Sequence, residues 1–83
     1  AISEVLKHLK LVGIVWEPPY IAKGLVMIED AGEVRCLAQG ETFQTKIEQS
    51  GNLKGVRIEI REIFKDKVTL RYENEDAILI LSE

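Results

Sequence analysis

The chain has 83 residues, of which 46% are hydrophobic and 30% are charged, and its formal net charge at pH 7 is −3. This composition fits one folded domain over residues 1–83 and argues against disorder, although so short a chain forms only a small core. The 11 basic and 14 acidic residues are interspersed, so we expect no nucleic-acid partner, because phosphate binding needs clustered cations.

The N-terminal segment, residues 1–8, contains Ser3 as a helix cap and apolar residues at helical spacing, which predicts a short helix over residues 3–8. Residues 9–16 form a nearly continuous apolar run, which predicts a first strand that is buried on both faces over much of its length. Gly13 inside this strand indicates a bulge or a close backbone approach. The two prolines within residues 17–23 predict a loop, because proline has no amide hydrogen.

A second strand is predicted over residues 25–29 and a third over residues 34–39. In the third strand Val34, Cys36 and Ala38 share one face, and we expect Cys36 to be a small buried apolar residue. Residues 44–54 are polar and are predicted to form a loop with a flexible tip at residues 50–52.

Residues 55–72 carry the clearest β pattern of the chain, because apolar residues alternate with charged ones on both sides of a polar turn at Lys65 and Asp66. The alternation breaks at Glu62, which predicts a bulge or a sharp bend near that residue. Two amphipathic strands joined by so short a turn predict a hairpin.

Residues 77–81 are apolar on both faces, so we expect this last strand in the centre of a sheet.

The pattern as a whole predicts an all-β fold of about six strands, a small sandwich or barrel of two packed antiparallel sheets with a short N-terminal helix. The predicted core consists of Leu11, Val15, Val26, Ile28, Val56, Ile58, Ile60, Val68, Leu70, Leu79 and Leu81.

No group of residues suggests catalysis, a metal site or a cofactor, so we do not expect an enzyme. His8 is the only histidine and has no partner for acid–base chemistry in the sequence pattern. The acidic turns at residues 29–33 and 73–76 lack the ligand spacing of a calcium loop. The aromatic residues Trp16, Tyr20 and Phe43 have no cations among them, which favours anchoring of the core or a loop over stacking on bases.

Several blocks in order resemble the homology-region domain of the type II secretion C component, and the related lipoprotein that partners the type IV pilus secretin. These blocks are the apolar strand around Gly13, the apolar strand at residues 25–29 ending in acid, Gly40 with Glu41, and the hairpin at residues 60–70. The resemblance covers residues 9–82. The loop with two prolines is long for the family, and residues 73–76 stand where a glycine-containing turn is common.

The resemblance implies a fold of two small antiparallel sheets and a role in protein transport, as a periplasmic adaptor. Such a domain binds the N-terminal periplasmic domain of an outer-membrane secretin and links it to inner-membrane platform proteins. It also implies that the parent protein is attached to the inner membrane by an anchor upstream. The chain begins at Ala1 rather than methionine, so we expect it to be cut from a longer protein.

An alternative reading is a small SH3-like or Sm-like barrel that binds peptide or nucleic acid, and a third is the regulatory domain of an unrelated enzyme. For the adaptor, the first strand is the predicted docking edge, because a loop that cannot pair follows it and because its apolar residues exceed what one sheet face requires. The residues predicted to bind the partner are Leu9, Leu11, Val12, Gly13, Ile14, Val15 and Trp16.

Overall fold

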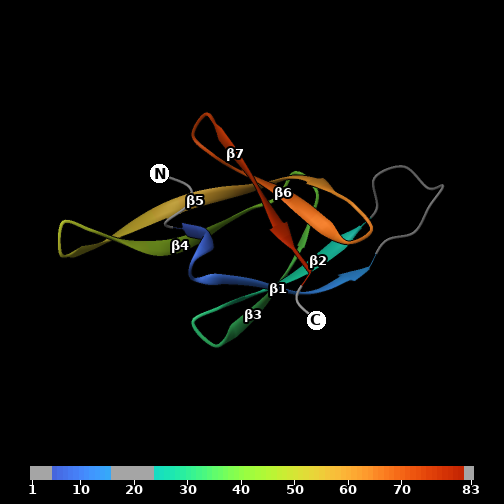
Figure 1. The fold of residues 1–83 in the computed structure, drawn as a ribbon, viewed down its shortest axis with the longest axis horizontal. Coiled ribbons are helices and arrows are strands. Elements are labelled where there is room, and N and C mark those ends of the chain that lie inside the picture. The colour runs from blue at the N-terminus through green and yellow to red at the C-terminus, as the bar shows by residue number, and fades with distance from the viewer. Residues whose placement is uncertain (1–4, 16–23, 82–83) are drawn as a thin grey trace.

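Seven strands form two antiparallel sheets in the computed structural model, which describes residues 5–15 and 24–81, without the side chain of Gln49 (Figure 1). The three-stranded sheet has the order β1 (Leu9–Val15), β2 (Leu25–Asp30), β3 (Glu33–Ala38). The four-stranded sheet has the order β4 (Thr42–Gln49), β5 (Asn52–Ile63), β6 (Lys67–Tyr72), β7 (Glu75–Ile80). The predicted all-β fold of two antiparallel sheets is confirmed.

The chain enters β1 from a helical turn. Val5 and Leu6 have helical backbone, and the His8 amide donates a 3.1 Å hydrogen bond to the Val5 carbonyl. Val5 is fully buried, so this turn covers part of the core. The remainder of the predicted helix, at Ser3 and Glu4, lies outside the described residues.

The β5–β6 hairpin agrees with its sequence pattern. Ile60 pairs with Leu70 and Glu62 pairs with Thr69, which leaves the predicted bulge between Ile60 and Glu62. The Phe64 amide donates a 2.9 Å hydrogen bond to the Lys67 carbonyl, and this bond closes the predicted turn.

The prediction of a polar loop over residues 44–54 is wrong, because this segment forms β4 and the beginning of β5. Phe43, Thr45 and Ile47 alternate inward and are buried, while their neighbours in the strand are exposed. Ser50 and Gly51 have positive φ angles of 54° and 78° and form the two-residue connection between the strands. Such a turn matches the twist of a hairpin.

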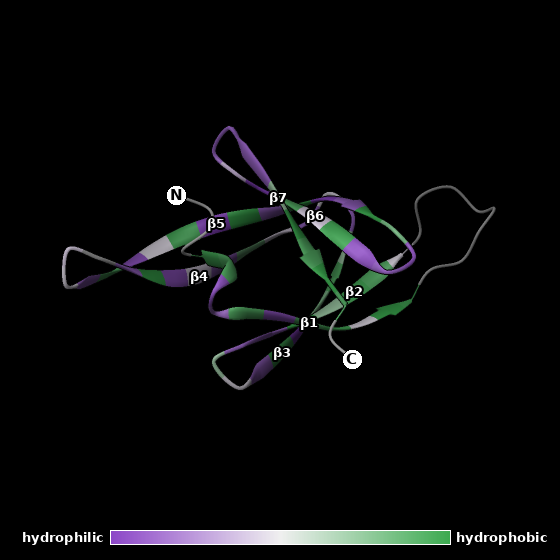
Figure 2. Cartoon of the chain, in the orientation of Figure 1, coloured by the Kyte–Doolittle hydropathy of each residue, from purple (hydrophilic) through white to green (hydrophobic). Residues whose placement is uncertain are grey.

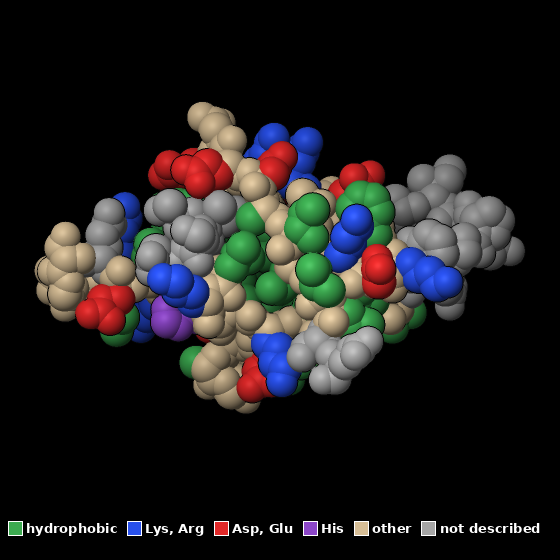
Figure 3. All heavy atoms as spheres, viewed as in Figure 1, with side chains coloured by type: hydrophobic (Ala, Val, Ile, Leu, Met, Phe, Trp, Pro, Cys, Tyr) green, Lys and Arg blue, Asp and Glu red, His purple; other side chains and the backbone are tan. Residues whose placement is uncertain are grey.

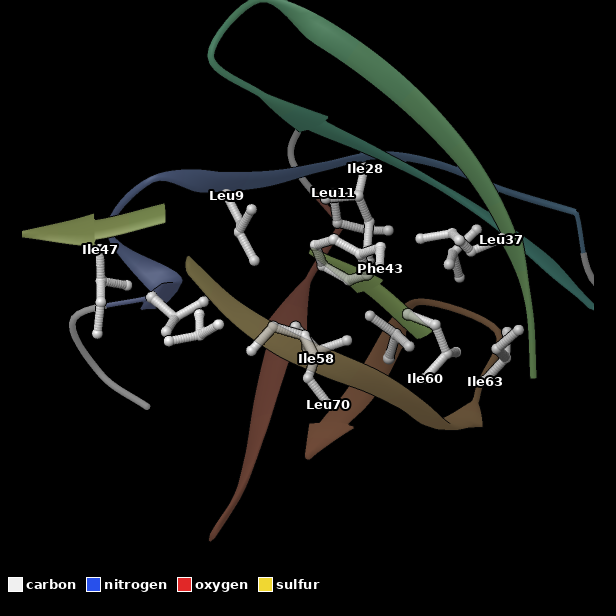
Figure 4. Close-up of a cluster of buried hydrophobic side chains, with 14 residues drawn as sticks. Leu9, Leu11, Ile28, Leu37, Phe43, Ile47, Ile58, Ile60, Ile63 and Leu70 are labelled. Atoms are coloured by element: carbon white, nitrogen blue, oxygen red, sulfur yellow. The ribbon is translucent and has the colours of Figure 1, made fainter. Parts of the chain in front are cut away.

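The core lies between the two sheets and combines side chains from both (Figure 4). Leu11, Ile28, Ile58, Ile60 and Leu70 are among its fully buried members. The other buried apolar residues are Val5, Leu9, Val26, Leu37, Phe43, Ile47, Val56, Ile63 and Val68.

Three members of the predicted core differ in the structure. Val15 is 44% exposed, because the register shift between Leu11 and Gly13 changes the alternation of β1, so that Ile14 rather than Val15 faces the core. Leu79 and Leu81 are only partly buried and pack against the core from its side.

The prediction that the last strand is central is wrong, because β7 is an edge strand that pairs only with β6 among the named strands. Its side chains Ile78 and Ile80 are exposed. The end of the strand crosses over β1, where Leu81 and Leu11 form an isolated parallel bridge (Figure 1). One face of β7 is therefore apolar because it packs against the core near this crossing, and the other face is apolar but exposed. Neither reflects a position between two neighbouring strands.

The molecule is elongated, with extents of 45 × 26 × 16 Å, and the β4–β5 hairpin projects beyond the rest of the fold (Figure 1). Hydrophilic residues become frequent toward the ends of the β4–β5 and β6–β7 hairpins, while hydrophobic residues lie nearer the crossing of the strands (Figure 2). Each sheet has two edge strands, and these edges are the places where a partner strand could pair.

Candidate partner-binding surface

The predicted docking strand β1 is an edge strand, but its side chains divide between two surfaces. Leu9 and Leu11 are buried in the core, so their side chains do not lie on the exposed surface of β1, and their contact with a partner stays a prediction. Ile14 is half-buried and packs against the same core. The edge itself is occupied at Leu11 by the bridge to Leu81. Trp16, the last predicted contact residue, lies outside the described residues.

The remaining predicted residues, Val12, Gly13 and Val15, belong to the opposite surface of β1. Val12 is the extra residue of a bulge, because Leu11 pairs with Ile28 and Gly13 pairs with Met27. A Cβ atom placed on Gly13 would clash with the terminal methyl carbon of Met27. Gly13 is therefore needed so that the Met27 side chain can lie over the β1 backbone. This agrees with the prediction that Gly13 marks a bulge or a close approach.

The three-stranded sheet presents an apolar outer face, which we define as Val12, Val15, Leu25, Met27, Val34 and Cys36. Strand pairing places Met27 between Gly13 and Cys36, and Leu25 between Val15 and Ala38. Apolar side chains therefore extend across all three strands rather than along β1 alone, and Val34 is 59% exposed. A continuous exposed apolar face of this kind is typical of a protein-interaction surface.

Cys36 contradicts the expectation of burial, because it is exposed on the outer face. Its neighbour Leu37 is the residue of β3 that enters the core. The expectation assigned the face of Val34 and Cys36 to the interior, whereas the face of Arg35 and Leu37 is the one directed inward, with Arg35 partly buried. The alternation in β2 and β3 was the signal that could have revealed the full outer face.

A second apolar region lies on β7. Ile78 and Ile80 are exposed, and Ile80 is 70% exposed. Figure 3 shows hydrophobic side chains gathered near the centre of this view, over the position of β7 in Figure 1. Ile80 directly precedes Leu81, whose bridge to Leu11 occupies the middle of the β1 edge.

Side chains that could act in catalysis or bind a metal do not converge in the part of the chain that the structure describes. His8 is exposed, and no group of three or more His, Cys, Asp or Glu side chains within residues 5–15 and 24–81 could hold a metal ion. Phe43 is buried in the core, as predicted. Tyr20 lies outside the described residues.

The acidic turn at residues 73–76 includes one defined ion pair. Asp76 accepts a 2.8 Å hydrogen bond from Nε of Arg71 across the β6–β7 pair. This hydrogen bond and the charge of Arg71 hold the pKa of the Asp76 carboxyl below its usual range. The pair orders the turn and does not form part of a reactive site.

The fold and surface define a small all-β, two-sheet protein with an exposed apolar face. No protein-family model, curated protein or solved structure matches the chain. Among the described residues no helix has the length and apolar character needed to cross a membrane.

Proposed function

We propose that this domain is a periplasmic adaptor of a secretion or pilus machine. In this role it binds the N-terminal periplasmic domain of an outer-membrane secretin and couples it to platform proteins of the inner membrane. The ordered blocks around Gly13, Gly40 and the β5–β6 hairpin support the proposal through their resemblance to the type II secretion C component. The observation that carries it structurally is the apolar outer face, which offers a partner a surface spanning three strands.

The secretin domain would lie across the outer face and reach the end of β1 that follows the bulge. Val12 and Val15 would contribute side chains, while Leu25, Met27 and Val34 would extend the contact across β2 and β3. Leu9 and Leu11 would keep their core positions during binding. This arrangement differs from simple strand addition along the whole of β1, because the Leu81 bridge occupies the middle of that edge.

A contact limited to the outer face of three short strands would be small and therefore weak for a single domain. Small interfaces of less than about 1,200 Å² are typical of transient complexes. A secretin is a ring of identical subunits, and presentation of many copies would raise the overall affinity without new contacts. An anchor in the parent protein would hold the domain at the inner membrane and so raise its local concentration near the secretin.

The proposal is tested by titrating the domain with a secretin N-terminal domain and following backbone amide shifts. We expect the perturbed amides to lie on β1, β2 and β3. Val34→Asp places a charge on the outer face and should abolish binding, while the fold survives because Val34 is largely exposed. The matched control is Leu53→Asp, which introduces the same charge at another exposed apolar position and should bind as the parent does.

Two results would contradict the proposal. One is perturbation confined to β6 and β7 with a silent outer face, which would place the interface at the other apolar region. The other is loss of binding in Leu53→Asp together with normal binding in Val34→Asp. Saturable binding of a nucleic acid would favour the barrel alternative, which the net charge of −3 does not support.

A further inference from the structure

A groove of about 760 Å³ separates the β2–β3 hairpin from the β4–β5 hairpin. Asp30 and Arg35 lie on one wall, and Gln44, Lys46 and Glu48 of β4 lie on the other. Nε of Arg35 is buried without a hydrogen-bond partner among the described residues. The groove therefore leaves the outer edge of β4 accessible and contains a donor that no described group satisfies.

The pairing of β4 with β5 determines which backbone groups face this groove. The Ile60 amide donates to the Glu41 carbonyl, and hydrogen-bonded pairs then alternate along the antiparallel ladder. Thr45 and Ile47 accordingly direct their backbone groups toward β5. Lys46 and Glu48 direct theirs toward the groove, where β4 has no neighbouring strand.

The charges on this edge are complementary to those of an identical strand. Lys46 and Glu48 are exposed, and neither has an ion-pair partner among the described residues. In an antiparallel pair of two β4 strands centred on Ile47, Lys46 of each copy lies opposite Glu48 of the other. Shifting the pairing by two residues would place Lys46 opposite Lys46, or Glu48 opposite Glu48, which is unfavourable.

We propose that β4 pairs with β4 of a second copy of this chain across a twofold axis at Ile47. The pairing would join the two four-stranded sheets into one, with about four backbone hydrogen bonds from the Lys46 and Glu48 pairs. A twofold contact of this kind is self-complementary, so it closes at the dimer. The projection of the β4–β5 hairpin from the body of the fold gives the second copy room to approach (Figure 1).

The other edge strands fit a second copy less well. On β3, the Ala38 amide already donates to the Glu41 carboxylate at 2.7 Å, so this part of the edge is occupied. On β1, the Leu81 bridge occupies the middle of the edge. The exposed isoleucines of β7 offer apolar area but no charges that would select a register.

The test uses single and paired charge reversals in the whole chain, with self-association measured by analytical ultracentrifugation from micromolar to millimolar concentration. Lys46→Glu and Glu48→Lys should each weaken dimerisation roughly tenfold or more, since each creates like-charge cross-strand pairs. Lys46→Glu combined with Glu48→Lys in one chain should restore it. An equimolar mixture of the two single variants should form a heterodimer, because every cross-strand pair is then of opposite charge.

Arg57→Glu is the control, because it reverses an exposed charge on β5, which is not an edge strand. It should dimerise as the parent does.

A parent chain that stays monomeric at millimolar concentration would overturn the proposal. So would self-association that Lys46→Glu leaves unchanged but Ile80→Asp abolishes, which would assign the contact to β7. Failure of the double variant to recover would overturn the Ile47-centred register, and with it the proposed pairing. None of these variants lies on the outer face, so secretin binding and dimerisation can fail independently.

Discussion

The Thr45 hydroxyl donates a 2.6 Å hydrogen bond to Oδ2 of Asp30 and thereby ties β4 of one sheet to the end of β2 in the other. Thr45 is the only polar residue that is buried in the described part of the chain. The bond fixes the β2–β3 hairpin relative to the β4–β5 hairpin at one end of the groove between them. It is a specific polar link in an otherwise apolar core.

Thr45→Val should therefore destabilise the domain, although valine preserves the shape of the side chain. The Asp30 carboxylate would lose a donor in a partly buried position, at a cost of about 1–3 kcal/mol. Urea denaturation measures the change. Thr42→Val is the matched control, since Thr42 is an exposed residue of the same strand, and it should be nearly neutral. Equal stabilities of the two variants would show that the bond contributes nothing.

Ile60 and Leu70 are paired across β5 and β6 and are both fully buried. Truncating either to alanine should lower the free energy of unfolding by about 2–4 kcal/mol, because each substitution removes buried methyl groups and leaves a cavity. Chemical denaturation of each variant tests this. Ile80→Ala, on the exposed face of β7, should change stability much less. Unaltered stability of Ile60→Ala and Leu70→Ala would refute the core assignment.

Gly13→Ala should displace the Met27 side chain, because the new Cβ would lie too close to its terminal methyl carbon. Since the end of a methionine side chain is flexible, the cost should be modest, about 1 kcal/mol. The Met27 methyl resonance should shift, and secretin binding should weaken because Met27 belongs to the outer face. Gly55→Ala is the control, as a Cβ there meets no atom within 4 Å. An unshifted Met27 methyl in Gly13→Ala would contradict this account.

The Arg71–Asp76 pair predicts a defined pH dependence. Because the hydrogen bond from Arg71 lowers the pKa of Asp76 in the folded protein, the pair stabilises the fold above the pKa of an unfolded aspartate, about 4. This contribution disappears as the pH falls through the lower pKa of the folded state. Carboxyl NMR titration should report the depressed pKa, and Arg71→Ala should return it toward the ordinary range. A pKa that is unchanged in Arg71→Ala would exclude Arg71 as the cause.

The hairpin of β5 and β6 could be predicted from the sequence because every signal for it is local. Alternation fixes which side chains are inward, and the broken alternation at Glu62 marks the bulge without reference to any other strand. The same local logic was available for β4, where Phe43, Thr45 and Ile47 alternate with polar residues. Thr45 made this alternation hard to recognise, because a threonine becomes a core residue only when a distant group such as Asp30 satisfies its hydroxyl.

The position of each strand within its sheet was decided only by the tertiary structure. The sequence of β7 is apolar on both faces, and this pattern does not distinguish a central strand from an edge strand that crosses another sheet. The bridge between Leu81 and Leu11 joins residues far apart in the chain. Likewise, the apolar outer face exists because strand pairing brings Val15, Leu25 and Met27 side by side. Local periodicity encodes which faces of a strand are apolar, whereas long-range pairing determines what those faces meet.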